Sequence, residues 1–458
     1  MKKSVLCSAS AALLLTTVLA GCGSSAPAAN NDKDKGAEAG KSTAGTEAKA
    51  GSFQMTVRHI NVRDTAKSTL ELLQKVTAKT EQEVPGLKLN LDGVEDTVNR
   101  DVKLKAEMSS GKPPHIFNLF GGADTQNYAK AGHLLPLNDI LKELGLSDQF
   151  YNLSEFTVDG KIYGLPESGY VEGFYYNKKM FQDAGVQVPK NWEEFLKVCE
   201  ALKAKKITPI ALGGGPESAW AINMLGNSLF VGLGGTELQE GFKPGKTKWT
   251  DAPVVEAFKR MKELKEKGYI DPNVLGLKYA EGQAKFYTGQ AAMLFDGTWA
   301  TSAVLDKEKS TVKDNVGFFR LPDVGGKGDG YINGGWSNGY GFSAHLNDNE
   351  LKAVKTFIKN FYTVENQADQ LNKANRIPAM KNVKGSNDAH PLVKEISDAQ
   401  GSSKGAFPAF DALVQPKVKV TLETSMQELL GGQIAPEKVA ERMQKTQEEA
   451  NKADGEKK

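Results

Sequence analysis

The hydrophobic pattern of the first folded segment changes period repeatedly, and this constrains the fold more than any other feature. Apolar and polar residues alternate over 53–57 and again over 87–91, which predicts two strands. Apolar residues recur at helical spacing over 66–83 and 96–110, and a third strand is expected at 115–120. Strands that alternate with helices in this order are typical of an α/β fold with a doubly wound, mostly parallel sheet.

Polar side chains follow each of these three strands. Asn61 and Asp64 come after the first strand, residues 92–95 after the second, and Asn118 lies at the end of the third. Ligands of open α/β sheets bind beyond the carboxyl ends of the strands, so Asn61, Asp64 and Asn118 are candidate ligand-binding residues. Capping of the next helix is an alternative role for Asp64.

A second informative stretch is 286–301, with the sequence FYTGQAAMLFDGTWAT. Gly289 suits a helix end, and the apolar run 291–295 predicts a short buried strand. The strand delivers Asp296 and Trp299 to its carboxyl end, as at the edge of a binding site. The alternative for Trp299 is a place in the core, because tryptophan is highly buried on average.

Two further tryptophans lie beside glycines. Trp220 follows the loop 213–215, and Trp336 lies in the glycine-rich stretch 334–343. Aromatic faces that bury about 150–250 Å² each suit the CH surface of a sugar ring, and carboxylates and amides suit its hydroxyl groups. Trp220, Trp299 and Trp336 with nearby acceptors therefore favour a carbohydrate site over a phosphate site, which would need arginines and helix N-termini.

Four stretches, in order, resemble family 1 of the bacterial extracellular solute-binding proteins, the sugar-capturing lipoproteins of ABC importers. They are Tyr163-Gly164-Leu165-Pro166, then Tyr175-Tyr176-Asn177-Lys178 with Phe181 and Gly185, then Pro189 with Trp192 and Phe195, and F-x-x-G-x-A-A-M-x-x-x-G-x-W over 286–299. The resemblance covers about Phe53 to Ala450. It implies a two-lobed, periplasmic-binding-protein-like α/β fold that captures a sugar or oligosaccharide and delivers it to the permease of an ABC transporter.

The resemblance also implies roles for single residues. In this family the tryptophan that matches Trp299 stacks on a sugar ring, and an acid near Glu167 accepts hydrogen bonds from sugar hydroxyls. Glu167 follows Gly164 and Pro166, which punctuate a strand pattern as a hinge would. The alternative for Glu167 is a surface ion pair.

Three crossings between the lobes are expected, at 163–168, 334–343 and 376–379. They predict an N-terminal lobe from 53–164 plus 340–375. The C-terminal lobe is then 166–336 plus 378–455.

The N-terminus has the pattern of a lipoprotein signal peptide over residues 1–21. Lys2 and Lys3 precede an apolar run, and Leu19-Ala20-Gly21-Cys22 resembles a lipobox, which implies that Cys22 carries lipid. Residues 22–52 hold no aromatic residue and predict a flexible tether. The expected location is the extracellular face of the cell membrane. A plain secretory leader or a membrane span remains an alternative.

Charge and composition argue against several other classes. Without Lys2 and Lys3 the chain has 56 basic and 56 acidic residues. The sequence contains no stripe of basic residues, so nucleic-acid binding is not predicted. The five histidines are scattered, so no metal or cofactor is expected. Cys199 is the only cysteine of the folded part, which excludes an internal disulfide. We expect a monomer without enzyme activity.

Two other functions stay open at this point. A secreted glycosidase would use two carboxylates across a cleft, and acids are plentiful in the chain. A receptor for a peptide or another small polar solute would need a charged anchor, for which Arg63 or Arg376 could serve.

The lipobox generates a prediction. Cys22→Ala is expected to leave a precursor that is either unprocessed or released, because the acyl-bearing thiol is gone. Metabolic labelling with a fatty acid and membrane fractionation measure this. A variant that still fractionates as a mature, acyl-bearing protein would contradict the assignment.

Overall fold

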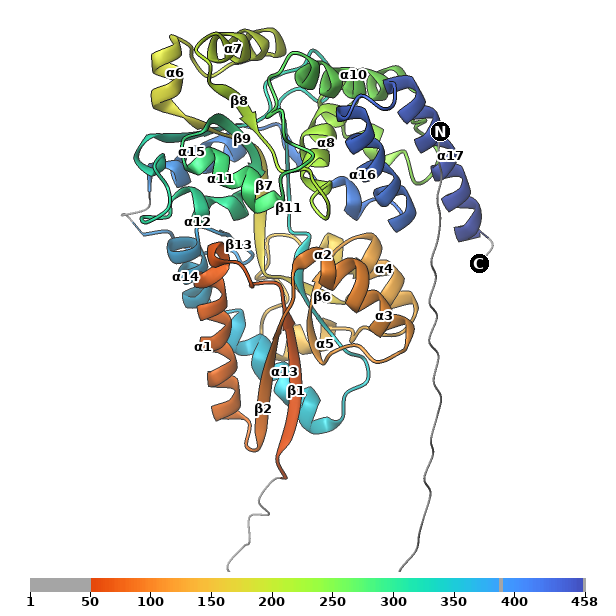
Figure 1. Ribbon diagram of the computed structural model, residues 1–458. Coiled ribbons are helices and arrows are strands. Elements are labelled where there is room, and N and C mark those ends of the chain that lie inside the picture. Colours follow the sequence, from red (N-terminus) through yellow and green to blue (C-terminus); the bar gives the residue numbers. More distant parts are fainter. Residues whose placement is uncertain (1–50, 387–389, 456–458) are drawn as a thin grey trace, which may run out of the picture. The chain divides into compact units, whose positions relative to one another are not determined.

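The computed structural model describes residues 51–386 and 390–455, so the expected signal peptide, Cys22 and nearly all of the tether lie outside it. Figure 1 shows a lower and an upper lobe, each with its own β-sheet and helices. No helix in the described ranges is long and apolar enough to cross a membrane.

The first lobe is built on a five-stranded sheet with the order β2-β1-β3-β12-β6. Its strands are β1 (Phe53–His59), β2 (Leu87–Gly93), β3 (Ile116–Phe120), β6 (Gly164–Pro166) and β12 (Asn338–Phe342). Its helices are α1 (Lys67–Glu83), α2 (Asp96–Val98), α3 (Leu104–Ser109), α4 (Ala123–Lys130), α5 (Asn138–Glu143), α13 (Asp348–Phe361) and α14 (Val364–Ala374). A two-stranded hairpin, β4 (Thr157–Val158) and β5 (Lys161–Ile162), precedes β6.

The second lobe is built on a sheet with the order β14-β11-β7-β9-β8, to which β10 and β13 add through β7. Its strands are β7 (Ser168–Asn177), β8 (Thr208–Ala211), β9 (Ala291–Gly297), β10 (Val316–Phe319), β11 (Tyr331–Gly335), β13 (Ile377–Pro378) and β14 (Gly405–Phe407). Its helices are α6 (Lys178–Ala184), α7 (Trp192–Ala204), α8 (Trp220–Gly234), α9 (Thr236–Glu240), α10 (Ala252–Glu266), α11 (Tyr279–Tyr287), α12 (Thr301–Val304), α15 (Pro391–Gly401), α16 (Pro416–Leu430) and α17 (Pro436–Gly455).

The two-lobed α/β fold is confirmed, and its sheets are more mixed than expected. In the first sheet β1 pairs in parallel with β2 and β3, while β12 is antiparallel to both β3 and β6. In the second sheet β7 is antiparallel to β9 and β11. The antiparallel pairs involve the strands that carry the chain between the lobes, which enter a sheet without a helical crossover.

The chain passes directly from one sheet to the other at two places. The chain leaves the first sheet in β6 and enters the second in β7, with Glu167 between them. It returns from β11 to β12 through Trp336 and Ser337.

The third crossing differs from the expectation. β13 pairs with the start of β7, but Ala379 and Met380 then pack in the first core, where the backbone of Tyr151 donates to Ala379. The final passage into the second lobe therefore lies beyond Met380.

A close backbone approach fixes the loop before α8. A Cβ on Gly213 would lie 2.3 Å from the carbonyl oxygen of Lys278, and one on Gly282 would lie 2.3 Å from the nitrogen of Gly213. Only glycines allow α11 to lie this close to the loop. The amide of Tyr279 donates to the hydroxyl of Ser218 at 2.9 Å across the same contact.

This packing generates a stability prediction. Gly213→Ala is expected to lower the free energy of unfolding by about 1–3 kcal/mol or more, because the added methyl group collides with backbone rather than with a movable side chain. Gly401→Ala is the matched control, since nothing lies within 4 Å of its added Cβ, and its stability is expected to be unchanged or slightly higher. Denaturant melts of both variants measure the difference. Equal stabilities would contradict the contact.

Candidate functional site

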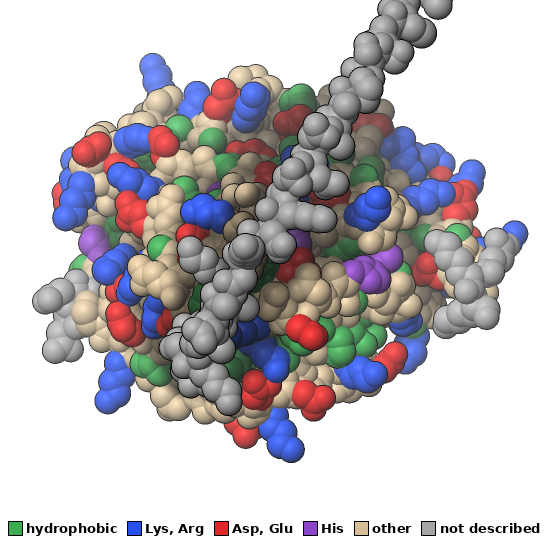
Figure 2. Space-filling view, turned by 90° about the horizontal axis from the view of Figure 1, so that it is seen from below, with side chains coloured by type: hydrophobic (Ala, Val, Ile, Leu, Met, Phe, Trp, Pro, Cys, Tyr) green, Lys and Arg blue, Asp and Glu red, His purple; other side chains and the backbone are tan. Residues whose placement is uncertain are grey.

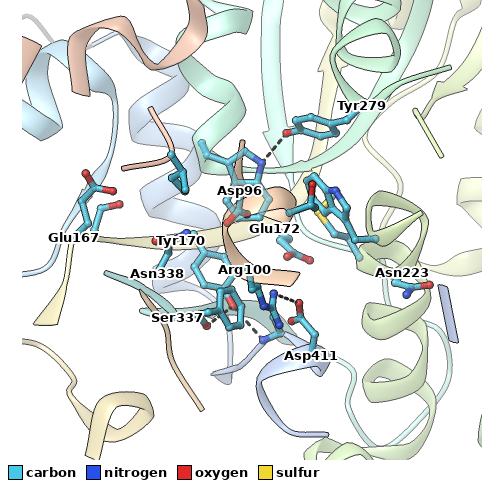
Figure 3. A pocket seen from close by; sticks show the side chains of 18 of the residues that line it. Asp96, Arg100, Glu167, Tyr170, Glu172, Asn223, Tyr279, Ser337, Asn338 and Asp411 are labelled. Carbon is cyan, nitrogen blue, oxygen red and sulfur yellow. Dashed lines mark hydrogen bonds and ion pairs between the residues drawn. The ribbon is translucent and has the colours of Figure 1, made fainter. Parts of the chain in front are cut away.

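A cavity of about 220 Å³ lies between the two sheets. Aromatic side chains form much of its wall, and polar side chains lie at both ends, as Figure 3 shows for Glu167 on one side and Asn223 on the other. The aromatic lining residues are Phe120, Tyr170, Trp220, Tyr279, Trp299 and Phe410. This combination suits a solute with both flat apolar faces and hydrogen-bonding groups.

A buried hydrogen-bond chain fixes the indole of Trp299. Its Nε1 donates to the hydroxyl of Tyr279 at 2.7 Å, and that hydroxyl donates to Asp296 at 2.9 Å. Gln283 donates to the same carboxylate at 2.9 Å. Asp296 is fully buried, and this burial raises its pKa to about 6 in spite of these donors. The carboxyl group therefore holds the tyrosine that in turn orients the tryptophan.

The ring faces of the second lobe lie close together around this chain. The ring of Trp220, the first residue of α8, lies 4.6 Å from that of Tyr279, and the ring of Tyr170 lies 5.4 Å from that of Trp299. Arg63 of the first lobe covers Tyr279, with its guanidinium carbon 5.1 Å from the ring centroid. The aromatic wall is thus held by contacts from both lobes.

Glu167 lies at the opposite end of the cavity, at the first crossing. It is buried, and the hydroxyl of Tyr340 donates to it at 3.3 Å. Burial raises its pKa, although the positive charge of Arg376 and a hydrogen bond with Asn61 act against this. The alternative of a surface ion pair does not fit this environment.

Ion pairs join the lobes beside the cavity. Arg100 of the first lobe contacts Asp411 of the second at 2.6 Å and Asp124 of its own lobe at 3.0 Å. Lys419 of the second lobe contacts Asp101 at 3.0 Å. Burial opposes the ionisation of Asp411, but the charges of Arg100 and Lys419 and the hydrogen bond from Arg100 together outweigh it and lower the pKa of that carboxyl group. The two lobes are therefore held together by charge as well as by packing.

Four of the eight predicted ligand-binding residues line the cavity together, namely Asn61, Glu167, Trp220 and Trp299. The structure places the other four elsewhere. Asp64 is exposed and contacts Lys309 at 2.6 Å, and Asp296 lies behind Tyr279. Asn118 lies behind Asn338, to which it donates. The ring of Trp336 stacks on Tyr151 at 6.0 Å, outside the lining. Ligand contact by any of the eight stays a prediction.

Sequence reasoning missed several lining residues of the second lobe. Tyr170, Glu172 and Asn333 belong to β7 and β11, and Asn223 and Asn227 lie one turn apart on α8. One signal was available, because two asparagines at i and i+4 interrupt an otherwise apolar helix face. No comparable signal marked Glu172, since a buried acid in a strand has no characteristic pattern.

Two further observations concern metal ligands among the described residues and the charges on one face of the molecule. In the described ranges, no group of three or more His, Cys, Asp or Glu residues could hold a metal ion. On the face shown in Figure 2, basic and acidic side chains are interspersed rather than gathered by sign.

Comparisons with known proteins agree with this geometry. A family model described as bacterial extracellular solute-binding protein matches residues 66–368. A multiple sugar-binding protein of Streptococcus mutans is 28% identical over 314 residues, which cover 67% of this chain and 70% of that protein.

Solved structures extend the similarity. A chitin oligosaccharide binding protein is 74% identical and superposes with a TM-score of 0.87, covering 87% of this chain and 99% of that chain. A solute-binding protein, RafE, in complex with raffinose superposes with a TM-score of 0.72, and the match covers 87% of this chain and 100% of that chain. The two sequences are 21% identical, so this similarity bears on the fold alone.

The buried carboxyl group generates a prediction on pH. The pKa of Asp296 is about 6 in the folded protein and close to 3.8 unfolded, so the folded state binds the proton more tightly. Its contribution to stability is complete below pH ~4 and is lost as the pH rises through ~6. Relative to Asp296→Asn, the wild type should therefore lose about 2–2.5 kcal/mol of unfolding free energy between pH 4 and pH 7.

Urea melts of both proteins at several pH values measure this. Glu193→Gln serves as the control, because the exposed Glu193 pairs with Lys197 and its pKa is lowered, so any pH effect has the opposite sign. A difference between wild type and Asp296→Asn that does not change with pH would contradict the prediction.

Proposed function

Because this chain belongs to the bacterial extracellular solute-binding proteins, we propose that it captures a chitin oligosaccharide in the cavity and delivers it to an ABC transporter permease. The observation that carries this proposal is the cavity between the lobes, where the half-buried rings of Trp220 and Trp299 lie beside Tyr170. Such rings can stack on the apolar faces of successive sugar units. The 74% identity to a chitin oligosaccharide binding protein supports the ligand class.

The charges around the cavity support a neutral ligand. Arg63 contacts Glu95 at 2.6 Å, and Arg376 lies near Glu167, so both candidate anchors for a charged solute already face carboxyl groups. A peptide or amino-acid ligand, whose terminal charges need such anchors, is therefore not favoured. The relatives are named as binding proteins, and we propose that this chain likewise has no catalytic activity.

The remaining parts of the proposal concern the whole protein. Residues 1–21 act as a lipoprotein signal peptide, and lipid on Cys22 anchors the mature chain to the extracellular face of the cell membrane. Residues 22–52 form a tether. The predicted lobes then close on the ligand about the hinge, and the protein acts as a monomer.

The test is a calorimetric titration with N-acetylglucosamine oligosaccharides, together with Trp299→Ala. Loss of a stacking ring is expected to weaken binding by about 2–4 kcal/mol, or roughly 30- to 1000-fold in Kd. Trp192→Ala is the matched control, because Trp192 lies at the start of α7 and outside the cavity lining. This variant should bind the oligosaccharide with the affinity of the wild type. Because we propose that the protein has no catalytic activity, the oligosaccharide should be recovered uncleaved after the titration.

Denaturant melts of ligand-free Trp299→Ala distinguish a binding role from a core role. A core tryptophan would cost about 3–5 kcal/mol of unfolding free energy on truncation. A loss of that size with near-normal affinity would remove Trp299 from the site. Failure of every chitin oligosaccharide to bind would overturn the ligand class.

A further inference from the structure

Several buried amide atoms in the lining of the cavity have no hydrogen-bond partner within the described part of the chain. Asn227 of α8 is 3% exposed, and neither its Oδ1 nor its Nδ2 is bonded within the described part of the chain. Asn333 of β11 is 2% exposed, and its Oδ1 is also unbonded. The Oδ1 of Asn223, one turn before Asn227, is likewise without a partner. All three side chains line the cavity.

Unpaired amides at these positions are costly unless a ligand completes them. A buried polar group without a partner has lost its hydrogen bonds to water without replacing them, and the rest of α8 is almost entirely apolar and buried. Spacing of four residues puts Asn223 and Asn227 on one face of the helix. The described residues therefore present three acceptors and one donor to the cavity.

The neighbouring groups restrict what can bind there. The register of β7 and β11 places Asn333 opposite Glu172, and Asn333 donates to that carboxyl group at 2.8 Å. Burial, with the nearby negative charges of Asp296 and Asp411, raises the pKa of Glu172 well above its usual range. Burial and these charges therefore disfavour the ionised form of Glu172, so this carboxyl group is better suited to an uncharged partner than to an amine.

Apolar side chains line the same cavity as the amides. Met224 follows Asn223 on α8, and Phe410 lines the same cavity, and both are buried. An amide with an attached methyl group matches these surroundings. Its N–H can donate to an unpaired amide oxygen, its carbonyl can accept from the unpaired amide nitrogen, and its methyl group can contact the apolar side chains. A hydroxyl group would leave the apolar surface unfilled, and an ammonium group, which only donates, would leave the Nδ2 of Asn227 without an acceptor.

We propose that Asn223, Asn227 and Asn333 bind the 2-acetamido group of an N-acetylhexosamine unit and so select acetylated oligosaccharides. The inference rests on the proposed function and adds the residues that determine specificity. Figure 3 shows Asn223 on its helix, well separated from Glu167, so the acetamido site and the hinge end occupy different parts of the cavity.

The test compares three trisaccharides with the same β-1,4 linkage by calorimetry. They are N,N′,N″-triacetylchitotriose, cellotriose, which has a hydroxyl at C2, and the chitosan trisaccharide, which has an amine there. The wild type is expected to bind the acetylated sugar at least about 100-fold more tightly than either analogue, because the analogues leave buried amides unpaired. Equal affinity for cellotriose would overturn the inference.

Variants assign the selectivity to these residues. Asn227→Leu is expected to weaken binding of triacetylchitotriose about 10- to 100-fold, without lowering the melting temperature of the ligand-free protein. Asn223→Leu, at a half-buried position, is a second variant with the same expectation if the first does not fold. Asn360→Leu is the control, since this buried amide of α13 also has an unpaired oxygen but lies outside the cavity. It should lower stability and leave affinity unchanged.

Failure of this inference and failure of the proposed function give different results. If the wild type binds triacetylchitotriose and both cavity variants bind it equally well, the acetamido site is wrong while the proposed function stands. If the wild type binds a different sugar and no chitin oligosaccharide, the ligand class is wrong, and this inference falls with it.

Discussion

The pairing of β7 is the constraint on which the rest of the site depends. This ten-residue strand begins at the first crossing and pairs with β9, β10, β11 and β13. Alternate residues point to opposite faces, so Ser168, Tyr170 and Glu172 reach the cavity in one row. Phe174 continues that row into the main core of the second lobe. The pairing of β7 therefore determines where the first crossing lies, which side chains form this wall of the cavity, and where the cavity gives way to the core.

Local sequence signals predicted a large part of this structure. The alternating pattern located β1 and β2. Asn191 and Asn347 each precede a helix and accept from a backbone amide in its first turn, which is a local signal of a helix start. Glycines and prolines marked the first two crossings. These features depend on neighbours in the chain, which a sequence displays directly.

Features that depend on distant pairing were not predictable in the same way. The sequence placed Asp296 at a strand end, but only the fold shows that Tyr279 and Gln283 close over it from α11. The passage beyond Met380 depends on contacts with Tyr151, which is more than two hundred residues earlier. Glu172 and Asn333 face each other only because β7 and β11 are antiparallel. In each case the deciding partner is remote in sequence.

The ion pairs between the lobes have a consequence for how quickly a bound solute can leave. In the proposed mechanism the lobes part to release the solute, and parting separates Arg100 from Asp411 and Lys419 from Asp101. The work of separating these charges belongs to the barrier for dissociation, so the pairs lengthen residence time even where they add little to the equilibrium between lobes. Dissolved salt screens charges as they begin to separate into water. We therefore propose that the ionic strength outside the cell influences the lifetime of the loaded protein, and with it how long cargo is held before a transporter meets it.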